Sequence, residues 1–561
     1  MINQNQITEA FNNYFVDKIT PTNKDANIDE CNYIDRVCNS MFLTPAAPKD
    51  IFDIIRSLKN TNSVGYDGIS TSIIKTVKDF ICGPLTHILN LSITAGVYPN
   101  SLKTAIIKPI FKKNDKEDLD CYRPIALLPI FSKIYEKYLD REIRSYLDSN
   151  KILAAEQKGF RRNKSINHAI FDFLKTITNN VDKKTPICAV YMDMTQAFDC
   201  VDHECLLKKL EKYGLRGNVN NLIRSYLCNR SQFTETTKVH MKTKELITYR
   251  SGKRFVTYGV PQGSVFGPLL FILYSNDLPK VTKHCMTQFA DDSTCIVKCK
   301  SKETYENDIN QMIKDVVTWM TNNNLKINLA KTKIMHFRQK TSIPLLDIQY
   351  DNVKIDQVNV TKFLGLVIDA RLKWKEHIEH LCKRISSSSY ALYRLSKVTD
   401  IDTRITAYHG LVASVLRYGV IFWGNSTDKA IIFKQQKRCL RVMFDLKPLD
   451  SCKPFFIKYK LLTFPCIYIY EVAVFVKSNP DLYKKMSQVS VRNRRDDKLV
   501  CEKAKTALKS KSIFCMAQKI FNKLPKALRD LNTIQFKLKL KSLLTNKCYY
   551  TIDEFFRDRH L

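Results

Sequence analysis

The sequence lacks the cysteine spacing of a zinc site or of a disulfide framework. It contains 18 cysteines in 561 residues, but no two of them form a CxxC pair. No group of cysteines and histidines has zinc-finger spacing either. We therefore expect free thiols, buried for the most part, in a reducing compartment.

It also lacks a membrane-spanning run and a secretion signal. The two most apolar stretches, 411–423 and 461–476, are interrupted by Arg417 and Glu471, and both are shorter than the roughly 18–20 apolar residues that span a bilayer. The first residues have no basic start and no apolar core. We expect a soluble intracellular protein, in the nucleus or the cytoplasm, that is not secreted and makes no membrane contact.

What the chain does have is positive charge. Lysine and arginine outnumber aspartate and glutamate by 90 to 55, a formal net charge of +35. No single lysine block accounts for the excess, so the basic surface extends along the chain. A distributed basic surface favours a long polyanion such as nucleic acid. The alternative is a generally basic, solvated surface without a partner.

The pattern of apolar residues divides the chain coarsely. The first 45 residues or so are polar, and an amphipathic helix capped by Asp50 is predicted to follow. Helical and strand-like patterns then alternate to about residue 370. Beyond that point the chain is mainly helical and rich in lysine and arginine. The pattern predicts a mixed catalytic body followed by a helical basic part.

Candidate chemistry lies at two strand ends. The apolar, strand-like run Ile187–Met192 is followed by Asp193, and two adjacent carboxylates, Asp291 and Asp292, lie between the strand-like runs 285–289 and 294–297. Taken alone, each pattern is more typical of an ordinary turn or cap. Adjacent carboxylates repel one another, however, unless a cation lies near them. If the fold brings the three together, their oxygen ligands suit a pair of Mg²⁺ ions.

A third element lies between these two in the sequence. The segment 258–271 contains a Pro-Gln-Gly turn, including Gln262 and Gly263, before an apolar helix. A glycine there allows close approach of a ligand, and the start of a helix favours phosphate. A plain entry from a loop into a helix is the alternative.

In this order, the three segments resemble motifs A, B and C of reverse transcriptases. The flanking sequence is closest to the non-LTR (LINE-type, jockey-like) retrotransposon kind. The supporting segments upstream and downstream are Ser63–Ile69, Ile106–Ile110, Tyr122–Ile125, Glu156–Arg161, Asn324–Lys333 and Phe363–Leu366. The resemblance extends from about residue 50 to 380.

The resemblance implies an α+β right-hand polymerase fold. Its fingers and its palm, with an antiparallel sheet carrying the metal site, would span residues 50–370. A helical thumb would span 371–450. A polar lead-in (1–49) would precede the fingers, and a helical basic C-terminal region of unknown role (451–561) would follow the thumb. Apolar residues at helical spacing from Trp374 to Leu392, with lysines and an arginine around them, suit the thumb. An ordinary amphipathic surface helix is the alternative.

The resemblance also implies residue roles. Asp193, Asp291 and Asp292 would be the catalytic metal ligands, with Asp292 the weaker one. They would hold two Mg²⁺ ions, with Mn²⁺ as a substitute, which activate a primer 3′-hydroxyl and stabilise the leaving pyrophosphate. The residues expected to bind the deoxynucleoside triphosphate are Phe198 (the gate against a 2′-hydroxyl), Gln262, Gly263, Arg123, Lys108 and Lys331.

Arginine suits phosphate because its planar fork pairs with two oxygens. Lys331 would protonate the pyrophosphate. For each of these residues a structural role is the alternative: a core phenylalanine, or a solvated cation. Four positions carry residues other than those common in the family: Gln196, Phe266, Phe289 and Ser293. These differences leave the rate and the fidelity of polymerisation open, but they remove no metal ligand.

The expected substrates are an RNA template, a DNA primer and deoxynucleoside triphosphates. Full-length elements of this type carry an endonuclease before the polymerase, and too few residues precede the fingers here to form one. We therefore expect a truncated or separate polymerase piece, with the endonuclease supplied separately. Two hypotheses remain: an active RNA-directed DNA polymerase, or a catalytically silent, truncated or domesticated nucleic-acid-binding protein.

Overall fold

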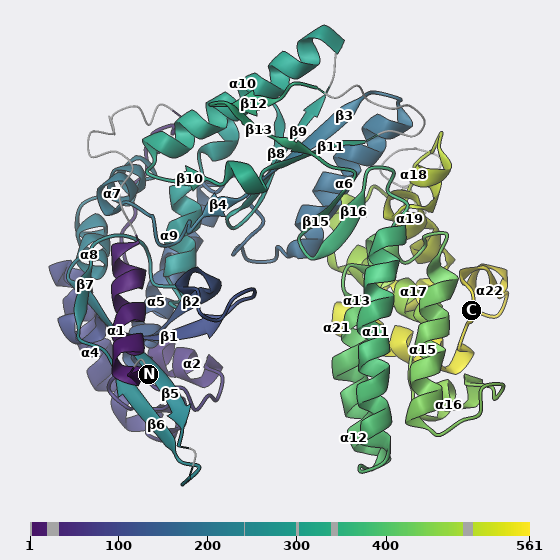
Figure 1. The fold of residues 1–561 in the computed structure, drawn as a ribbon, viewed down its shortest axis with the longest axis horizontal. Coiled ribbons are helices and arrows are strands. Elements are labelled where there is room, and N and C mark those ends of the chain that lie inside the picture. Colours follow the sequence, from purple (N-terminus) through teal and green to yellow (C-terminus); the bar gives the residue numbers. More distant parts are fainter. Residues whose placement is uncertain (1–2, 19–32, 241, 299–301, 338–345, 486–497) are drawn as a thin grey trace.

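The computed structural model describes residues 3–18, 33–240, 242–298, 302–337, 346–485 and 498–561. The chain forms an arch, in which two limbs extend from a central sheet (Figure 1). The first limb carries the N-terminus, and the second limb carries the C-terminus. The mixture of helices and sheets agrees with the predicted α+β class.

The central sheet contains five strands in the order β14-β11-β3-β9-β8. Strand β3 pairs antiparallel with both β9 and β11, and β8 and β9 form a hairpin. The bounds are β3 Ile187–Met192, β8 Cys285–Phe289, β9 Asp292–Lys298, β11 Lys333–Phe337 and β14 Asp356–Gln357. The strands predicted before Asp193 and on both sides of Asp291 are thus confirmed.

Strand β3 is apolar throughout because both of its faces are covered. Ile187, Ala189 and Tyr191 belong to one hydrophobic core, whereas the alternating residues Cys188 and Val190 belong to another. Side chains of a strand alternate between faces, so a strand covered on both faces needs a continuous apolar run. The run Ile187–Met192 therefore places one rigid, dry strand directly before Asp193.

The first limb combines a second sheet with helices. Strand β1 pairs antiparallel with β2 and parallel with β5, which in turn pairs with β6 and β7. These strands are β1 Thr104–Phe111, β2 Tyr122–Leu127, β5 Arg230–Val239, β6 Leu246–Arg250 and β7 Arg254–Val256. The helices before the central hairpin are α1 Gln4–Asp17, α2 Pro48–Ser57, α3 Thr71–Thr76, α4 Lys78–Ala95, α5 Ile130–Ser149, α6 Ile166–Asp182, α7 His203–Lys212, α8 Asn218–Leu227 and α9 Gly267–Tyr274.

Smaller elements border the central sheet. Helix α10 (Lys302–Asn322) follows the hairpin and packs into the core that also contains Cys188 and Val190. Two short strand pairs connect the sheet to its neighbours: β4 (Met194–Thr195) with β10 (Lys326–Ile327), and β15 (Val360–Phe363) with β16 (Leu366–Asp369). A third short pair is β12 (Gln349–Tyr350) with β13 (Val353–Lys354).

The second limb is helical, as predicted for the chain beyond residue 370. Its helices are α11 Lys375–Ser396, α12 Ile401–Tyr408, α13 Ser414–Arg417, α14 Val420–Trp423, α15 Lys429–Met443, α16 Lys453–Lys458, α17 Phe464–Ser478, α18 Ala507–Lys511, α19 Ile513–Lys523, α20 Lys526–Arg529, α21 Thr533–Lys547 and α22 Ile552–Arg557. One hydrophobic core extends from Ala189 in β3 through α11 and α17 to Phe555 in α22. The segments before and after residue 450 therefore share one core.

Two details differ from the sequence prediction. Helix α2 begins at Pro48, two residues before Asp50, because proline is well suited to the first turn of a helix; Asp50 accepts the backbone N–H of Ala47 instead of capping the helix itself. Trp374 precedes α11 in a left-handed conformation (φ 67°) and is not part of the helix. In the part of the chain that the structure describes, the cysteines are free thiols, and no helix is long and apolar enough to cross a bilayer.

Candidate functional site

The register of the central sheet brings Asp193 next to Asp292. Met192, the last residue of β3, pairs with Ser293 of β9. Continuing this antiparallel register by one residue sets Asp193 opposite Asp292. Two carboxylates that are far apart in the sequence thus occupy neighbouring strand ends, as the site hypothesis requires.

Asp291 lies in the two-residue turn of the adjoining hairpin. Phe289 pairs with Asp292, so Ala290 and Asp291 form the turn, and Ala290 has a left-handed backbone (φ 59°). The loop after α5 holds this turn. The buried side chain of Gln157 accepts the N–H groups of Ala290 (3.0 Å) and Gly159 (2.8 Å) and donates to the carbonyl of Ala290 (3.2 Å).

The same loop lies so close to the turn that only glycine fits at position 159. A Cβ atom on Gly159 would lie 2.2 Å from the backbone nitrogen of Ala290. Backbone hydrogen bonds from Lys158 to Gln288 and from Gln288 to Glu156 complete the contact. The turn that carries Asp291 is therefore fixed by side-chain and backbone bonds together.

A cavity of about 800 Å³ opens in front of the aspartates. Asp193 and Asp292 line it together with the lysines Lys112, Lys331 and Lys362. The Nζ atom of Lys331 lies 3.1 Å from Oδ2 of Asp193. A site with carboxylates on one wall and ammonium groups beside them can bind a cation and a phosphate next to each other.

The pKa values of Asp291 and Asp292 are shifted by their surroundings. Burial, together with the charges of Asp291 and Asp193, raises the pKa of Asp292 to about 6. Burial and the charge of Asp193 also raise the pKa of Asp291, whereas Arg123 and Lys112 oppose that rise. Asp291 and Asp292 therefore resist ionisation because they are buried and lie near other negative charges, and a cation beside them would relieve that repulsion.

The donor set fits a hard divalent cation, but the shell is not preassembled. Carboxylate oxygens are the ligands that such ions prefer. Among the residues that the structure describes, however, no three His, Cys, Asp or Glu side chains are grouped closely enough to form a ready metal site. Lys331 instead neutralises Asp193.

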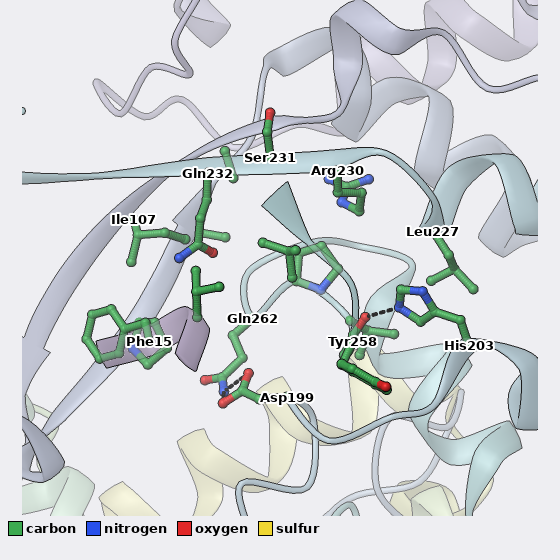
Figure 2. Close-up of a pocket in the computed structure, with 18 residues that line it drawn as sticks. Phe15, Ile107, Asp199, His203, Leu227, Arg230, Ser231, Gln232, Tyr258 and Gln262 are labelled. Atoms are coloured by element: carbon green, nitrogen blue, oxygen red, sulfur yellow. Dashed lines mark hydrogen bonds between the residues drawn. The ribbon is translucent and has the colours of Figure 1, made fainter. Parts of the chain in front are cut away.

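Gln262 is held by a carboxylate that sequence reasoning did not single out. Its Nε2 atom donates to both oxygens of Asp199 at 2.8 Å. Figure 2 shows this pair facing each other beside Phe15 of α1, at the edge of a small cavity of about 70 Å³. Burial raises the pKa of Asp199 to about 6, and the bond from Gln262 opposes that rise.

Phe198 forms part of a small aromatic stack. Its ring lies 4.4 Å from that of Phe271 in α9, with 22° between the planes. Phe160, next to the loop that holds the turn, contacts it edge-on at 6.0 Å. Phe198 is only partly buried, and its stacking on Phe271 fixes the orientation of its ring.

Two features of the Gly263 segment differ from the phosphate interpretation. A Cβ atom on Gly263 would lie 2.5 Å from the carbonyl oxygen of Ala126, so the close approach is to strand β2 rather than to a ligand. The N–H groups of Val265 and Phe266, just before α9, both donate to the buried carboxylate of Glu136 at 2.6 and 3.1 Å. This helix start is therefore already occupied and does not offer a phosphate site.

Lys108 lies outside the aspartate cavity. It is on β1, and its Nζ atom lies 2.5 Å from Oε1 of Glu235, which also pairs with Arg250. Lys112, just beyond the end of the same strand, lines the cavity instead. Burial and the charges of Arg123 and Lys331 lower the pKa of Lys112, so this lysine belongs to the cationic side of the site.

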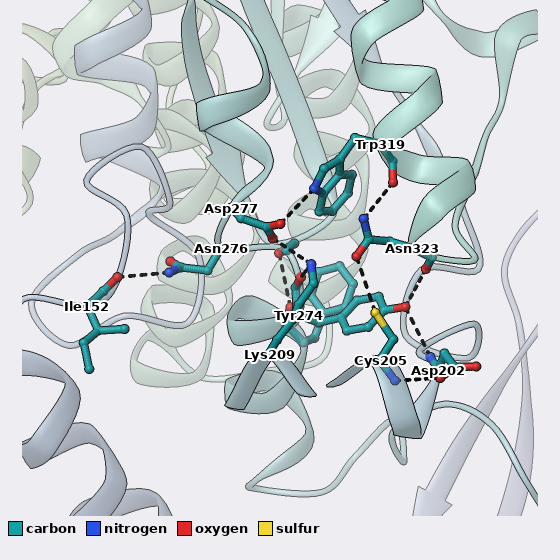
Figure 3. A network of polar contacts seen from close by, with 11 residues as sticks. Ile152, Asp202, Cys205, Lys209, Tyr274, Asn276, Asp277, Trp319 and Asn323 are labelled. Carbon is teal, nitrogen blue, oxygen red and sulfur yellow. Dashed lines mark hydrogen bonds and ion pairs between the residues drawn. The ribbon is translucent and has the colours of Figure 1, made fainter. Parts of the chain in front are cut away.

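A buried polar network joins helices that share a hydrophobic core with strand β3. Lys209 of α7 and Asp277 form a fully buried ion pair at 2.7 Å, and Trp319 of α10 donates to the same carboxylate at 3.0 Å. Figure 3 shows how this network connects α7, α9 and α10. Removing one partner of such a pair leaves the other charge buried without a counter-charge, which is strongly destabilising. The network therefore fixes α7, α9 and α10 relative to one another.

Sequence reasoning missed Gln157, Asp199 and Lys112. Gln157 belongs to a segment that had been noted for its resemblance, but its position offered no chemical signal. Asp199 follows Phe198 directly in motif A, and Lys112 belongs to a lysine pair after an apolar strand. Each acts through a neighbour distant in the sequence, which the spacing of residues does not reveal.

An α+β fold with strand-end carboxylates beside cations is typical of a nucleic-acid polymerase domain. Residues 111–368 match the family model described as reverse transcriptase (RNA-dependent DNA polymerase). This part of the chain is therefore a reverse transcriptase domain, and the predicted resemblance is confirmed.

Similar proteins in *Drosophila melanogaster* specify the kind of element. The chain is 27% identical over 400 residues to "Probable RNA-directed DNA polymerase from transposon X-element", a match that covers 70% of this chain and 43% of the relative. It is 28% identical over 422 residues to the corresponding protein of transposon BS (72% and 45%). It is 24% identical over 436 residues to "RNA-directed DNA polymerase from mobile element jockey" (74% and 46%). These relatives are named as polymerases of transposons or mobile elements, and the chain spans less than half of their length.

Proposed function

We propose that the protein is an RNA-directed DNA polymerase whose catalytic metal ligands are Asp193, Asp291 and Asp292. The observation that carries this proposal is the placement of Asp193 and Asp292 at neighbouring strand ends, with Asp291 in the adjoining turn. A protein that only binds nucleic acid has no need of clustered carboxylates, because they repel phosphate.

The aspartates would hold two Mg²⁺ ions, with Mn²⁺ as a substitute. When bound, such ions supply Lewis acidity to the attacking hydroxyl and the leaving phosphate oxygens. The protein's own contribution is positional. Gln157 fixes the turn of Asp291, and the register of β3 and β9 sets Asp193 beside Asp292. Lys331 keeps Asp193 paired in the metal-free protein.

The cationic side of the cavity would receive the triphosphate of a deoxynucleotide. Arg123, Lys112 and Lys331 are the cations whose charges act on the aspartates or on one another. Phe198 would exclude a 2′-hydroxyl, because its ring is held by Phe271 and is only partly buried. Gln262 and Gly263 would lie beside the incoming nucleotide, with Gln262 oriented by its bonds to Asp199.

Lys108 has the weakest support among the proposed nucleotide ligands. Its ion pair with Glu235 would have to break before it could reach a phosphate. Lys112 lines the aspartate cavity and carries the same charge. We assign the triphosphate contact to Lys112 in the first place and to Lys108 only in the second.

The parts of the fold correspond to a right hand in this proposal. The first limb would be the fingers, the central sheet the palm and helices α11–α15 the thumb, together spanning residues 50–450. Helix α1 of the polar lead-in (1–49) would pack against the fingers, supported by the hydrogen bond between the hydroxyls of Thr8 and Thr236. Residues 451–561 complete the thumb core. The substrates would be an RNA template and a DNA primer, with an endonuclease supplied separately.

Primer extension tests the proposal. Purified protein would be supplied with an RNA template, a DNA primer, deoxynucleotides and Mg²⁺, alongside an Asp291→Asn/Asp292→Asn variant. An Asp402→Asn variant is the matched control, because Asp402 is an exposed aspartate on α12. We expect extension by the wild type and the control, and loss of at least ~10³-fold in the double variant, since the ligands of both metal ions are altered.

The silent nucleic-acid-binding protein is the second candidate, favoured by the pairing of Lys331 with Asp193 and by the absence of a ready metal shell among the described residues. Template binding without extension by the wild type, with either Mg²⁺ or Mn²⁺, would overturn the enzymatic proposal and support this one.

A further inference from the structure

A separate cavity lies where the second limb meets helix α6. Its volume is about 650 Å³, and it shares no lining residue with the aspartate cavity. Four segments enclose it: α6, the residues just before α11, the loop after α14, and the stretch from residue 505 into α19. In Figure 1, α18 and α19 lie beside α6 at the top of the second limb.

The lining of this cavity is charged with one sign only. Five cations contribute to it, and no aspartate or glutamate does. Within the described ranges, none of the five forms an ion pair with a carboxylate. The cations are Lys184, Arg371, Lys373, Lys505 and Lys511. Cations that surround one cavity without a counter-charge repel one another, which raises the electrostatic energy of the free protein. A bound anion would lower that energy.

The inner part of the cavity is apolar and aromatic. Trp374, Phe422 and Phe514 are buried side chains that line it. The hydroxyl of Ser426, which also lines it, is buried and has no hydrogen-bond partner among the described residues. A planar, partly polar ligand would find both apolar contact and an unused hydrogen-bonding group in this cavity.

The walls are held in place by carboxylates that face the backbone. Asp369 accepts the N–H groups of Arg371, Lys373 and Trp374 at 2.7–3.1 Å. Asp182 accepts the N–H groups of Lys505 and Thr506 at 3.0 and 2.9 Å. Both carboxylates are buried, so they fix the cationic segments without neutralising the cavity. The cations are therefore presented on preorganised loops.

We infer that this cavity binds a single-stranded nucleic acid, with one unstacked base in the aromatic interior and the adjoining phosphates on the lysine and arginine rim. The rim supplies counter-charge for phosphates, and the interior supplies a surface on which a base of any identity can pack. The site is separate from the proposed polymerase centre and does not depend on catalysis. It would hold the strand outside the region where nucleotides are added.

Binding of a labelled single strand to the full chain tests this inference. The probe is a fluorescein-labelled oligouridylate of about 15 nucleotides, within the range of strand-binding sites. It would be offered in the presence of a saturating unlabelled primer–template duplex, which occupies the proposed polymerase centre. An oligothymidylate of equal length distinguishes RNA from DNA: selective RNA binding points to the template, and equal binding points to a site that reads no 2′-hydroxyl.

Two kinds of variant separate charge from shape. Lys373→Glu/Lys511→Glu reverses two charges at the rim, and Lys519→Glu/Lys539→Glu reverses two exposed charges that line neither cavity. Ala507→Trp fills the cavity from an exposed lining position without changing its charge, and Ala507→Ser is its control. Thermal unfolding confirms that each variant is folded.

We expect the rim variant to lose at least ~10-fold in affinity and about 1–2 units of the salt dependence, because two phosphate contacts are lost. Ala507→Trp should lose affinity as well, and both controls should keep it. Cross-linking with 4-thiouridine in the same oligomer should modify peptides containing 371–374 or 505–514.

Equal losses in the rim variant and in the Lys519/Lys539 control would overturn the inference, since they would indicate general charge attraction. Wild-type affinity of Ala507→Trp, or cross-links confined to other peptides, would also overturn it. If the rim variant does not fold, Ala507→Trp and the cross-links decide. An Asp291→Asn/Asp292→Asn protein should bind the oligomer normally, so failure of the proposed polymerase activity would remain distinguishable.

Discussion

Replacing Gln157 with leucine should impair catalysis without touching any residue that contacts substrate. Gln157 is fully buried and makes three hydrogen bonds, two of them to the Ala290 backbone in the turn that carries Asp291. Leucine has a similar volume but cannot make these bonds. Each buried backbone group left without a partner costs about 1–3 kcal/mol, so the three together would cost roughly 3–9 kcal/mol if the turn did not move.

The turn can reduce this cost by shifting until water reaches the exposed groups. A shift of about 1 Å at a catalytic ligand can lower a rate ~10²-fold, because the reacting groups lose their alignment. We therefore expect single-turnover primer extension to fall by about two orders of magnitude, measured at a temperature where the variant remains folded. Gln157→Glu should not restore the rate, because a fully buried carboxylate next to the turn of Asp291 adds a desolvation cost and like-charge repulsion.

Gln436 provides a matched control in the second limb. It is equally buried and also makes three hydrogen bonds, to the Tyr408 hydroxyl, the Leu462 carbonyl and the Phe464 N–H. Gln436→Leu should lower the stability by a similar amount and leave the extension rate unchanged. Equal rates for the two variants would refute the positioning role of Gln157, because the loss would then follow stability alone.

Three further changes follow from the site. Phe198→Val should raise incorporation of ribonucleotides relative to deoxynucleotides by at least ~10-fold, because the ring that Phe271 holds in place would be removed. Competition between the two kinds of nucleotide in primer extension measures this ratio, and an unchanged ratio would contradict the role of Phe198 as a gate. Lys331→Met should lower the Mg²⁺ concentration for half-maximal activity, because the ammonium group no longer competes with the cation for Asp193. Extension rates measured over a range of Mg²⁺ concentrations test this prediction. A higher Mg²⁺ concentration for half-maximal activity would contradict competition between Lys331 and the metal ion. Asp199→Asn should stabilise the metal-free protein by ~1–3 kcal/mol at pH 8 and not at pH 4, measured by denaturant unfolding at both pH values. The pKa of Asp199 is raised to about 6, so its contribution to the stability of the folded state is complete below about pH 4 and is lost as the pH rises through 6. Equal changes in stability at the two pH values would contradict this assignment.

The elements that carry the aspartates could be predicted from the sequence because their signals are local. The run Ile187–Met192 is continuously apolar, and a strand of that composition is covered on both faces wherever it occurs. The hairpin around Asp291 likewise follows from two short strands and a tight turn. Even so, only the resemblance predicted that these two elements pair with each other.

The partners of the site residues could not be predicted, since they depend on segments that meet only in the folded chain. Lys108 and Lys112 are four residues apart in and after β1, and nothing in the local pattern tells which one reaches the aspartates. The difference is Glu235 on β5, which pairs with Lys108. In the same way, Glu136 of α5 occupies the start of α9, a role that neither segment reveals by itself.

Strand β3 is the common wall of two hydrophobic cores, and this has a mechanical consequence. Tyr191 packs in the core of the second limb, whereas Met192 packs in the core of the first. Asp193 follows directly in the chain. A displacement of the helices that cover Tyr191 is therefore transmitted to Asp193 through two covalently linked residues, with no interface in between that could absorb it.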